Sequence, residues 1–397
     1  MKEMTAKEIF DKHLAPTSTS PMGLEIVRAD GVYLYDSSGK AYMDLISGIS
    51  VSNLGHGHPK ITQAIKEQVD KYLFIMVYGE YLQGPQLKLA KRLADLLPAK
   101  LDCTYFVNSG TEANEAAMKL AKRATGRTEF ISCRGAYHGS THGSLSVSGN
   151  EVKKYAFRPL LPDVKFMDFN VLDDLELITK QTAGVLIEPV QGDAGVRIPS
   201  KKYLQALRQR CDETGALLIF DEIQTGFGRT GSLFAFEQFD VVPDVLTMGK
   251  ALGGGMAMGA FTASHELMQK WTHDPMLGHI TTFGGHPVCC AAALASLNVL
   301  IEEHIIDQVQ AKGELFRSLL KHDAIVEIRS IGLMFAIEMA DFDQVYRVVE
   351  RCLAKGIIGF WFLSTKNSFR IAPPLTITKA EIQKACQLII EAMDEVA

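Results

Sequence analysis

The sequence predicts an α/β protein with a mostly parallel central sheet, helices on both faces of that sheet, and a smaller α+β domain. Mid-chain, short apolar runs alternate with stretches whose apolar residues recur at i, i+3 and i+4, which is typical of strands joined by amphipathic helices. After Pro287 this pattern gives way to an Ala-rich helix and short mixed elements. A chain of 397 residues is also long enough for two cores.

Each element follows from a local pattern. Residues 31–45 contain two alternating runs around an Asp-Ser-Ser-Gly turn, which predicts an antiparallel hairpin. Amphipathic helices are expected at 112–124 and 201–214, an Ala-rich helix at about 289–303, and a polar amphipathic helix at the C-terminus. Strands are expected at residues 104–107, 129–133, 184–188, 216–221, 244–247 and 258–263. The predicted organisation is an N-terminal segment packing with the small domain (1–54), a large cofactor-binding domain (55–288) and a C-terminal small domain (289–397).

Composition narrows the classes of partner. A net charge of -5 gives no electrostatic reason to expect nucleic acid or an anionic membrane, so small molecules are the expected partners. The seven cysteines show no CxxC spacing, which favours reduced thiols and a cytoplasmic protein without a metal site. No apolar run reaches the roughly 18 residues that a membrane span requires.

Polar residues that end apolar strands are the first candidates for a site, because ligands of open parallel sheets bind beyond the carboxyl ends of the strands. Glu188 ends one such run, Asp221 and Gln224 follow another, and Lys250 lies just beyond a third. A partly desolvated lysine near an acid is suited to Schiff-base chemistry, because desolvation lowers its pKa and supplies the neutral amine. The alternative for Lys250 is a solvated lysine beside a glycine-rich turn.

Asp221 ends an otherwise apolar strand, where an unpaired carboxylate is costly to bury. A pyridinium N–H would be a suitable partner for this carboxylate. Two unit charges about 4 Å apart attract each other by roughly 4 kcal/mol at an effective dielectric near 20. The alternative is an aspartate that caps the following turn.

The stretch VNSGTEANEAAMKLA runs from a strand into a helix and places Ser109, Gly110 and Thr111 at the helix N-terminus. Hydroxyls and free backbone N–H groups at such a place suit a phosphate. A simple capping box explains the hydroxyls equally well. Residues 226–231 (GFGRTG) match the GxGxxG dinucleotide pattern, but they start five residues after the strand end and precede no clear helix, so we discount a nicotinamide site.

With these residues in place, the chain resembles the class III aminotransferases of pyridoxal-phosphate fold type I over nearly its whole length. The resemblance is close to the acetylornithine, ornithine and 4-aminobutyrate branches. The matching stretches are GISVSNLGHGHP, NSGTEANEAAMKLA, AYHG, IEPVQGDAG, FDEIQTGFGRTG, GKALGGG, TTFGGHP and RIAPPL.

The resemblance implies roles around the cofactor ring. Lys250 would carry pyridoxal 5'-phosphate as a Schiff base and move the proton, and Asp221 would pair with the pyridinium nitrogen. Gln224 would lie near the ring hydroxyl, Tyr137 would stack on the ring, and Glu188 would have a supporting catalytic role.

The resemblance also implies a homodimer with shared active sites. Gly110 and Thr111, with Ser109, would bind the phosphate, and Thr282 would reach it from the neighbouring subunit. His138, within the AYHG stretch, is the remaining expected cofactor-binding residue.

Substrate binding is implied at four positions. Arg370 would receive a carboxylate of glutamate or 2-oxoglutarate, and Asp193 stands where related branches have a glutamate that pairs with this arginine. Ser140 stands where those branches carry a second arginine, and Ile49 where ornithine aminotransferases have a tyrosine. The donor therefore either lacks the usual carboxylate, as in a diamine, or binds it elsewhere, with His142 as one candidate.

The predicted function is transfer of an amino group from an ω-type amine or amino acid to 2-oxoglutarate or a similar keto acid, in two half-reactions at one site. An aminomutase is the alternative within the fold, and Arg370 argues against it because it indicates a dicarboxylate partner. A nicotinamide-linked oxidoreductase and a non-catalytic cofactor-binding protein are the alternatives from other classes.

Overall fold

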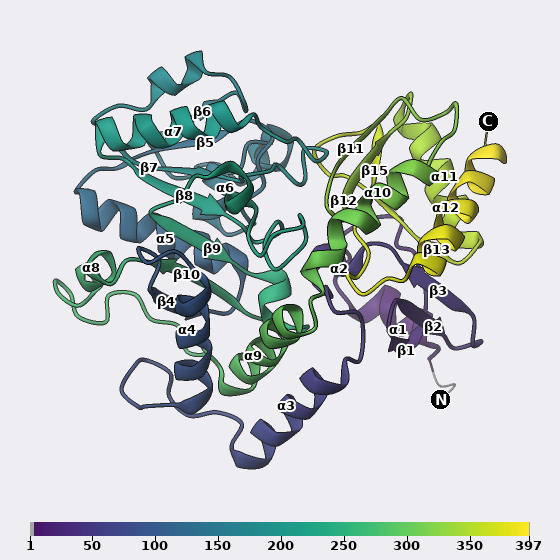
Figure 1. The fold of residues 1–397 in the computed structure, drawn as a ribbon, viewed down its shortest axis with the longest axis horizontal. Coiled ribbons are helices and arrows are strands. Elements are labelled where there is room, and N and C mark those ends of the chain that lie inside the picture. The colour runs from purple at the N-terminus through teal and green to yellow at the C-terminus, as the bar shows by residue number, and fades with distance from the viewer. Residues whose placement is uncertain (1–3, 397) are drawn as a thin grey trace.

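A computed structural model describes residues 4–396, and its largest element is a seven-stranded sheet (Figure 1). Strand β10 runs antiparallel to both β4 and β9, and the remaining pairs are parallel, so the prediction of a mostly parallel sheet is confirmed. Strand β6 was not predicted from the sequence. In spatial order the strands are β4 (Cys103–Val107), β10 (Gly259–Ala263), β9 (Val245–Met248), β8 (Leu217–Asp221), β7 (Thr182–Ile187), β5 (Glu129–Cys133) and β6 (Val164–Met167).

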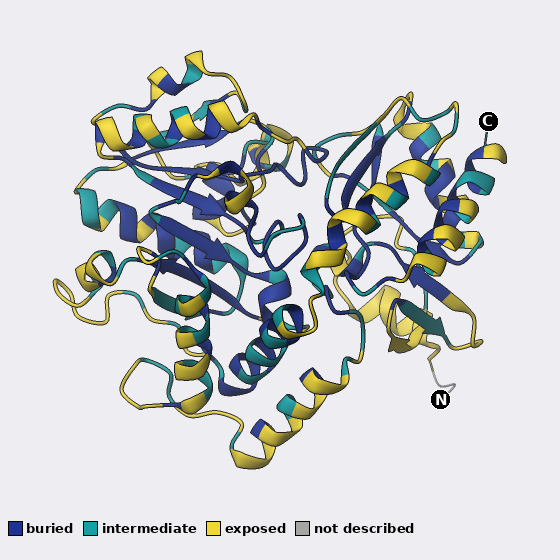
Figure 2. Cartoon of the chain, viewed as in Figure 1, coloured by how far each residue is buried: buried dark blue, intermediate teal, exposed yellow. Residues whose placement is uncertain are grey.

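Helices cover both faces of this sheet, as predicted. Successive side chains of a strand point to opposite faces. Leu186 accordingly packs in the cluster that contains the alanines of α5 (Gly110–Thr125), whereas Val185 packs in the cluster that contains Tyr203 of α7 (Lys201–Thr214). The five inner strands are buried, the edge strands β4 and β6 are only partly buried, and the outer sides of the helices are exposed (Figure 2). Glycines in the left-handed conformation, Gly126 and Gly215, end α5 and α7.

The N-terminal segment forms a separate four-stranded sheet. The predicted hairpin is confirmed as β2 (Tyr33–Asp36) and β3 (Ala41–Asp44), and β1 (Ile26–Asp30) extends it. On its other edge β3 pairs in parallel with β13 (Ile357–Ile358), which comes from more than 300 residues later in the chain. The N-terminal segment is thereby joined to the C-terminal part of the protein.

The C-terminal part contains a third sheet with helices against it. Its strands are β11 (Glu327–Ile331), β12 (Met334–Glu338), β15 (Ser368–Ile371) and β14 (Phe360–Trp361). Its helices are α10 (Val309–Leu319), α11 (Phe342–Ala354) and α12 (Lys379–Asp394). The Ala-rich helix α9 (Pro287–Glu302) precedes them and packs on α3 (Pro59–Lys71) and α4 (Gly84–Leu96). The domain boundaries at residues 54/55 and 288/289 stay predictions.

The remaining helices are short. The α-helices are α1 (Ala6–His13), α2 (Ser47–Ser50), α6 (His142–Val147) and α8 (His265–Met268). The 3-10 helices are η1 (Glu151–Lys153), η2 (Tyr155–Phe157), η3 (Asp173–Leu177), η4 (Ala235–Phe239), η5 (Lys250–Gly253), η6 (Gln269–Trp271) and η7 (Ile306–Gln308). Within residues 4–396 no single helix is long and apolar enough to cross a membrane. Only together do Pro287–Glu302 and Ile306–Leu319, which are bent by 54°, have the length and apolar composition of a membrane span.

A fully buried arginine ties the parts together. Arg229 donates from Nη1 to the carbonyl oxygens of Leu333 (2.9 Å) and Pro373 (2.6 Å), and from Nη2 to Asn53 Oδ1 (2.5 Å). Burial lowers the pKa of Arg229 to about 9, and Asp44 partly opposes this shift. The arginine lies in the GFGRTG segment, which forms turns that lead to η4 instead of a strand–helix junction. This geometry supports discounting the dinucleotide motif.

Candidate active site

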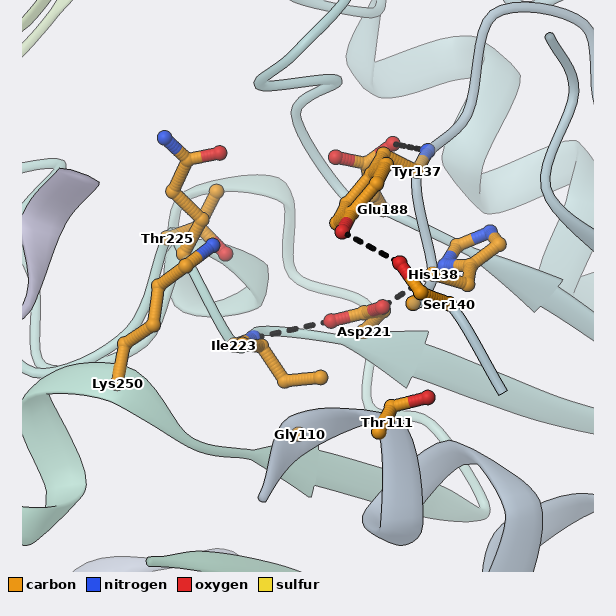
Figure 3. A pocket seen from close by; sticks show the side chains of 12 residues that line it. Gly110, Thr111, Tyr137, His138, Ser140, Glu188, Asp221, Ile223, Thr225 and Lys250 are labelled. Atoms are coloured by element: carbon orange, nitrogen blue, oxygen red, sulfur yellow. Dashed lines mark hydrogen bonds and ion pairs between the residues drawn. The ribbon is translucent and has the colours of Figure 1, made fainter. Parts of the chain in front are cut away.

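The strand ends converge on one cavity of about 260 Å³ (Figure 3). Strands β4, β5, β7, β8 and β9 end at this edge of the sheet, which is the expected place for a ligand. Nine of the predicted site residues lie in its wall, so sequence reasoning found most of the lining. The lining residues are Gly110, Thr111, Tyr137, His138, Gly139, Ser140, Glu188, Asp221, Ile223, Gln224, Thr225 and Lys250.

Lys250 lies on one side of the cavity, with His138 and Ser140 on the opposite side (Figure 3). Its backbone has φ 45°, a left-handed conformation that is uncommon for a residue with a side chain. Burial lowers the pKa of Lys250, Asp221 opposes that shift, and the charge of Arg370 adds to it. A lowered pKa favours the neutral amine that attacks an aldehyde.

Asp221 is a buried carboxylate in contact with a side-chain amide, an imidazole and a backbone N–H. Its Oδ2 accepts from Asn114 Nδ2 (2.8 Å) and lies 2.7 Å from His138 Nδ1, while Oδ1 accepts from the backbone N–H of Ile223 (3.1 Å). Among residues 4–396 no lysine or arginine forms an ion pair with it. The carboxylate is therefore placed to hold a cationic ring nitrogen in the cavity.

The N-terminus of α5 forms the floor of the cavity, below Asp221 and Ile223 in the view of Figure 3. Ser109 caps the helix by accepting from the N–H of Glu112 (3.3 Å), so the alternative of a capping residue holds for its hydroxyl. The N–H groups of Gly110 and Thr111 have no intrahelical acceptor at this position. A Cβ on Gly110 would lie 2.7 Å from Ile223 Cδ1, so glycine lets the helix end pack closely against the Ile223 side chain. This cradle suits a phosphate.

Glu188 is a second buried carboxyl, and it orients the segment that carries Tyr137. Its Oε2 accepts from the N–H of Tyr137 (3.3 Å) and its Oε1 from the N–H of Gly192 (3.0 Å). Burial raises the pKa of Glu188 to about 7, with His138 opposing the shift. Glu188 therefore exchanges a proton near neutral pH.

The predicted substrate pair lies beside the cavity and not in its lining. Arg370 Nη2 donates to Asp193 Oδ1 (3.0 Å), and both side chains are buried. Gly192, next to Asp193, packs against Gln224 of the cavity wall. Ser140 is in the lining and lies 3.3 Å from the Tyr137 hydroxyl.

Four predicted positions have other surroundings. Ser109 acts as the cap described above, and Ile49 lies in a left-handed turn with φ 65° that is only partly buried. Thr282 is exposed, and His142 is exposed at the start of α6, so neither contributes to this cavity within one chain. The predicted role of Thr282 needs a second subunit.

Sequence reasoning missed several contributors. Asn114, on α5, donates to both Asp221 Oδ2 and the His138 carbonyl oxygen (each 2.8 Å) and accepts from Thr247. An asparagine on the alanine-lined face of α5 was the available signal, because a buried amide needs partners. Ile223 and Thr225 line the cavity but carry no distinctive pattern in the sequence.

The cavity thus combines three features: an amine with a lowered pKa, a carboxylate that no lysine or arginine of residues 4–396 pairs with, and a helix end suited to a phosphate. An aldehyde cofactor with a basic ring nitrogen and a phosphate group, such as pyridoxal phosphate, fits all three. When bound, such a group supplies an electron sink for proton removal from an amine substrate.

Comparison with known proteins agrees with this arrangement. The family model "Aminotransferase class-III" matches residues 14–393. The acetylornithine aminotransferase of Methanopyrus kandleri is 39% identical over 394 residues, covering 98% of this chain and 99% of the relative.

Solved structures give the same result for the fold. A thermostable (S)-enantioselective omega-transaminase from Thermomicrobium roseum superposes with a TM-score of 0.91 at 30% identity, covering 98% of this chain and 97% of that chain. The ornithine aminotransferase of Toxoplasma gondii, whose crystals contain pyridoxal phosphate at partial occupancy, superposes with a TM-score of 0.91 at 29% identity, covering 100% and 96%. The predicted fold type I architecture is confirmed.

Proposed function

Because this chain belongs to the class III aminotransferase family and is a pyridoxal-phosphate-dependent transaminase, we propose a specific division of labour among its own residues. Lys250 would hold the cofactor, and its amine would accept and return a proton at the substrate carbon. Asp221 would keep the ring nitrogen of the cofactor protonated. The observation that carries this proposal is that Lys250 and Asp221 face one cavity while no lysine or arginine of residues 4–396 pairs with Asp221.

The other lining residues would position the cofactor. Gly110 and Thr111 would bind its phosphate through the N-terminus of α5, while Gln224 and Tyr137, which line the same cavity, would contact the ring. His138 supports Asp221 through its 2.7 Å contact, because a charged or hydrogen-bonding neighbour favours the carboxylate form. Glu188 holds the Tyr137 segment in place.

The acceptor in this proposal is 2-oxoglutarate, taken through Arg370. A planar guanidinium is suited to bidentate recognition of a carboxylate. The donor is an ω-type amine whose far end needs no arginine at position 140, because Ser140 offers only a hydroxyl there. Some relatives are named acetylornithine aminotransferases and one structural neighbour is named an omega-transaminase, so both donor classes belong in the test.

The assembly in this proposal is a homodimer with shared active sites in the cytoplasm. The loop between α3 and α4 exposes Leu73, Phe74 and Leu82, the last at 91%. The ring of Phe74 lies 5.2 Å from that of Phe283, next to the exposed Thr282. An apolar surface of this kind is typical of a subunit interface, and a partner seated there would bring Thr282 to the second site.

Half-reactions test the proposal directly. The holoenzyme would be mixed with single donors, namely N-acetylornithine, ornithine, 4-aminobutyrate, putrescine and glutamate, and formation of pyridoxamine phosphate followed by absorbance. We expect glutamate and at least one ω-amine to convert the cofactor, and Lys250→Ala to convert it with none. The proposed function would be contradicted if none of these amines converted the cofactor of the wild-type enzyme.

A further inference from the structure

Asp193, beside the cavity, is shared by two cations and held at both carboxylate oxygens. Its Oδ1 accepts from Arg370 Nη2 (3.0 Å) and from the N–H of Leu363 (3.3 Å). Its Oδ2 accepts from Ser364 Oγ (2.7 Å) and from Lys153 Nζ (3.5 Å). Three of these four donors remain if Arg370 turns to another anion, so Asp193 does not need to leave its place.

The charges of this cluster do not balance. Arg370 and Lys153 carry two positive charges, and Asp193 is the only carboxylate among residues 4–396 that pairs with either of them. Burial would raise the pKa of Asp193, but the two cations lower it below its ordinary value, so the carboxylate is ionised at neutral pH. The cluster is therefore one negative charge short of neutrality.

Arg370 has donors to spare for a second carboxylate. Only Nη2 has a partner in the described chain, and Nε is buried without one. The guanidinium carbon lies 4.4 Å from the centroid of the Phe362 ring, a stacked contact that fixes its plane. A buried N–H without a partner is costly, so an incoming carboxylate would satisfy it.

Lys153 lies at the edge of the catalytic cavity. Its Nζ is 5.0 Å from the centroid of the Tyr137 ring, and Tyr137 lines the cavity. Lys153 comes from η1 in the large part of the protein, whereas Arg370 and Ser364 come from the C-terminal part. Asn150 also donates to Ser364 (3.2 Å), so the η1 segment is fastened to the same cluster.

From these contacts we propose that Lys153 is a specificity-determining residue, one that lets the site accept a substrate carboxylate at Arg370 while Asp193 stays in place. This inference rests on the proposed function and concerns how the charges beside Arg370 are balanced when a substrate carboxylate binds there. With Lys153 present, two cations face two carboxylates. Without it, Arg370 alone would face both, which is costly in a buried place.

The charge count predicts a rescue. Lys153→Met should lower kcat/KM for the glutamate half-reaction at least tenfold, mainly through KM, while Lys153→Arg keeps it near the wild-type value. Asp193→Asn removes the competing carboxylate, so Lys153→Met should cost less than about threefold in that background. Carboxylate-free donors that the wild type accepts should change less than twofold.

The experiment measures the four half-reaction constants of this double-mutant cycle in the holoenzyme, with Lys153→Gln as a second neutral variant and the exposed Lys202→Met as the matched control. Equal losses in both backgrounds would show a structural role and overturn the proposal, as would no loss in either. Failure of the proposed function would give a different result, because none of the donors would then convert the cofactor of the wild-type enzyme.

Discussion

Two buried aspartates next to the same cavity are stabilised in opposite ways. Asp221 is surrounded by an amide, an imidazole and a backbone N–H, without a lysine or arginine in contact within the described chain. Asp193, at the other side, is paired with both Arg370 and Lys153. The exposed fractions of the two residues are nearly equal, 4% and 5%, so burial does not explain the difference.

The difference indicates what each side of the cavity receives. A carboxylate that no lysine or arginine neutralises attracts a cation, which suits the ring nitrogen of the cofactor. A carboxylate shared by two cations leaves positive charge over, which suits the carboxylate of a substrate. This contrast supports the proposal that the cofactor binds on the Asp221 side and that the substrate carboxylate is recognised on the Asp193 side.

Replacement of Asp221 by asparagine should give the largest effect, because a neutral amide cannot keep the ring nitrogen protonated. A loss of roughly 4 kcal/mol of ion pairing corresponds to about three powers of ten in the rate of proton removal. Single-turnover rates with glutamate would measure it. Asp44→Asn is the matched control, since Asp44 is also buried and lies 3.0 Å from a histidine, His56. A single-turnover rate of Asp221→Asn within tenfold of the wild-type rate would contradict the role assigned to Asp221.

Glu188, near the Asp221 side, gives a pH-dependent effect on stability. The pKa of Glu188 is raised from 4.5, its ordinary value, to about 7 in the folded protein. The stabilisation that the protonated Glu188 gives the folded state is therefore fully present below pH 4.5 and is lost as pH rises through 7. Relative to Glu188→Gln, the wild-type apoprotein should lose up to about 3 kcal/mol of unfolding free energy between pH 4.5 and 8.

Denaturant unfolding of both proteins at several pH values checks this prediction. Glu222, whose pKa burial also raises to about 7, is present in both proteins and cancels in the difference. A difference between wild type and variant that stays constant with pH would show that Glu188 is not protonated in the fold.

Ser140→Arg should give a smaller effect on donor specificity, because it adds a cation to the cavity wall away from both Asp221 and Asp193. An added charge-assisted hydrogen bond contributes roughly 1.5 to 3 kcal/mol, about one to two powers of ten in kcat/KM. N-acetylornithine, ornithine or 4-aminobutyrate should improve, while the glutamate half-reaction stays nearly unchanged. Ser140→Ala serves as the control, and a wild type that already strongly favours N-acetylornithine or ornithine would show that the pocket needs no such cation.

The sequence predicted the Asp221 side better than the Asp193 side, for a physical reason. Asp221 and Lys250 follow uninterrupted apolar strands, and the carboxyl ends of parallel strands must meet at one edge. Lys153 comes from the three-residue helix η1, which is too short to show a periodic pattern of apolar residues. Its contact with Asp193 depends on how two distant segments of the chain pack against each other.

Missed elements have the same origin. Strand β6 is only partly buried, so its side chains show no clear alternation, and β13 is two residues long and pairs with a strand more than 300 residues earlier. Asn114 was missed because one polar residue in a helix normally faces solvent. Local pattern predicts elements, whereas long-range packing decides which isolated polar residues meet.

The most direct test of the account is to locate the bond between protein and cofactor. The holoenzyme would be reduced with borohydride, digested, and the labelled peptide identified by mass spectrometry. We expect a single adduct on Lys250, in the peptide that contains Gly249 and Ala251. An adduct on another lysine, Lys153 included, would contradict the assignment of Lys250 and with it the division between the two sides of the cavity.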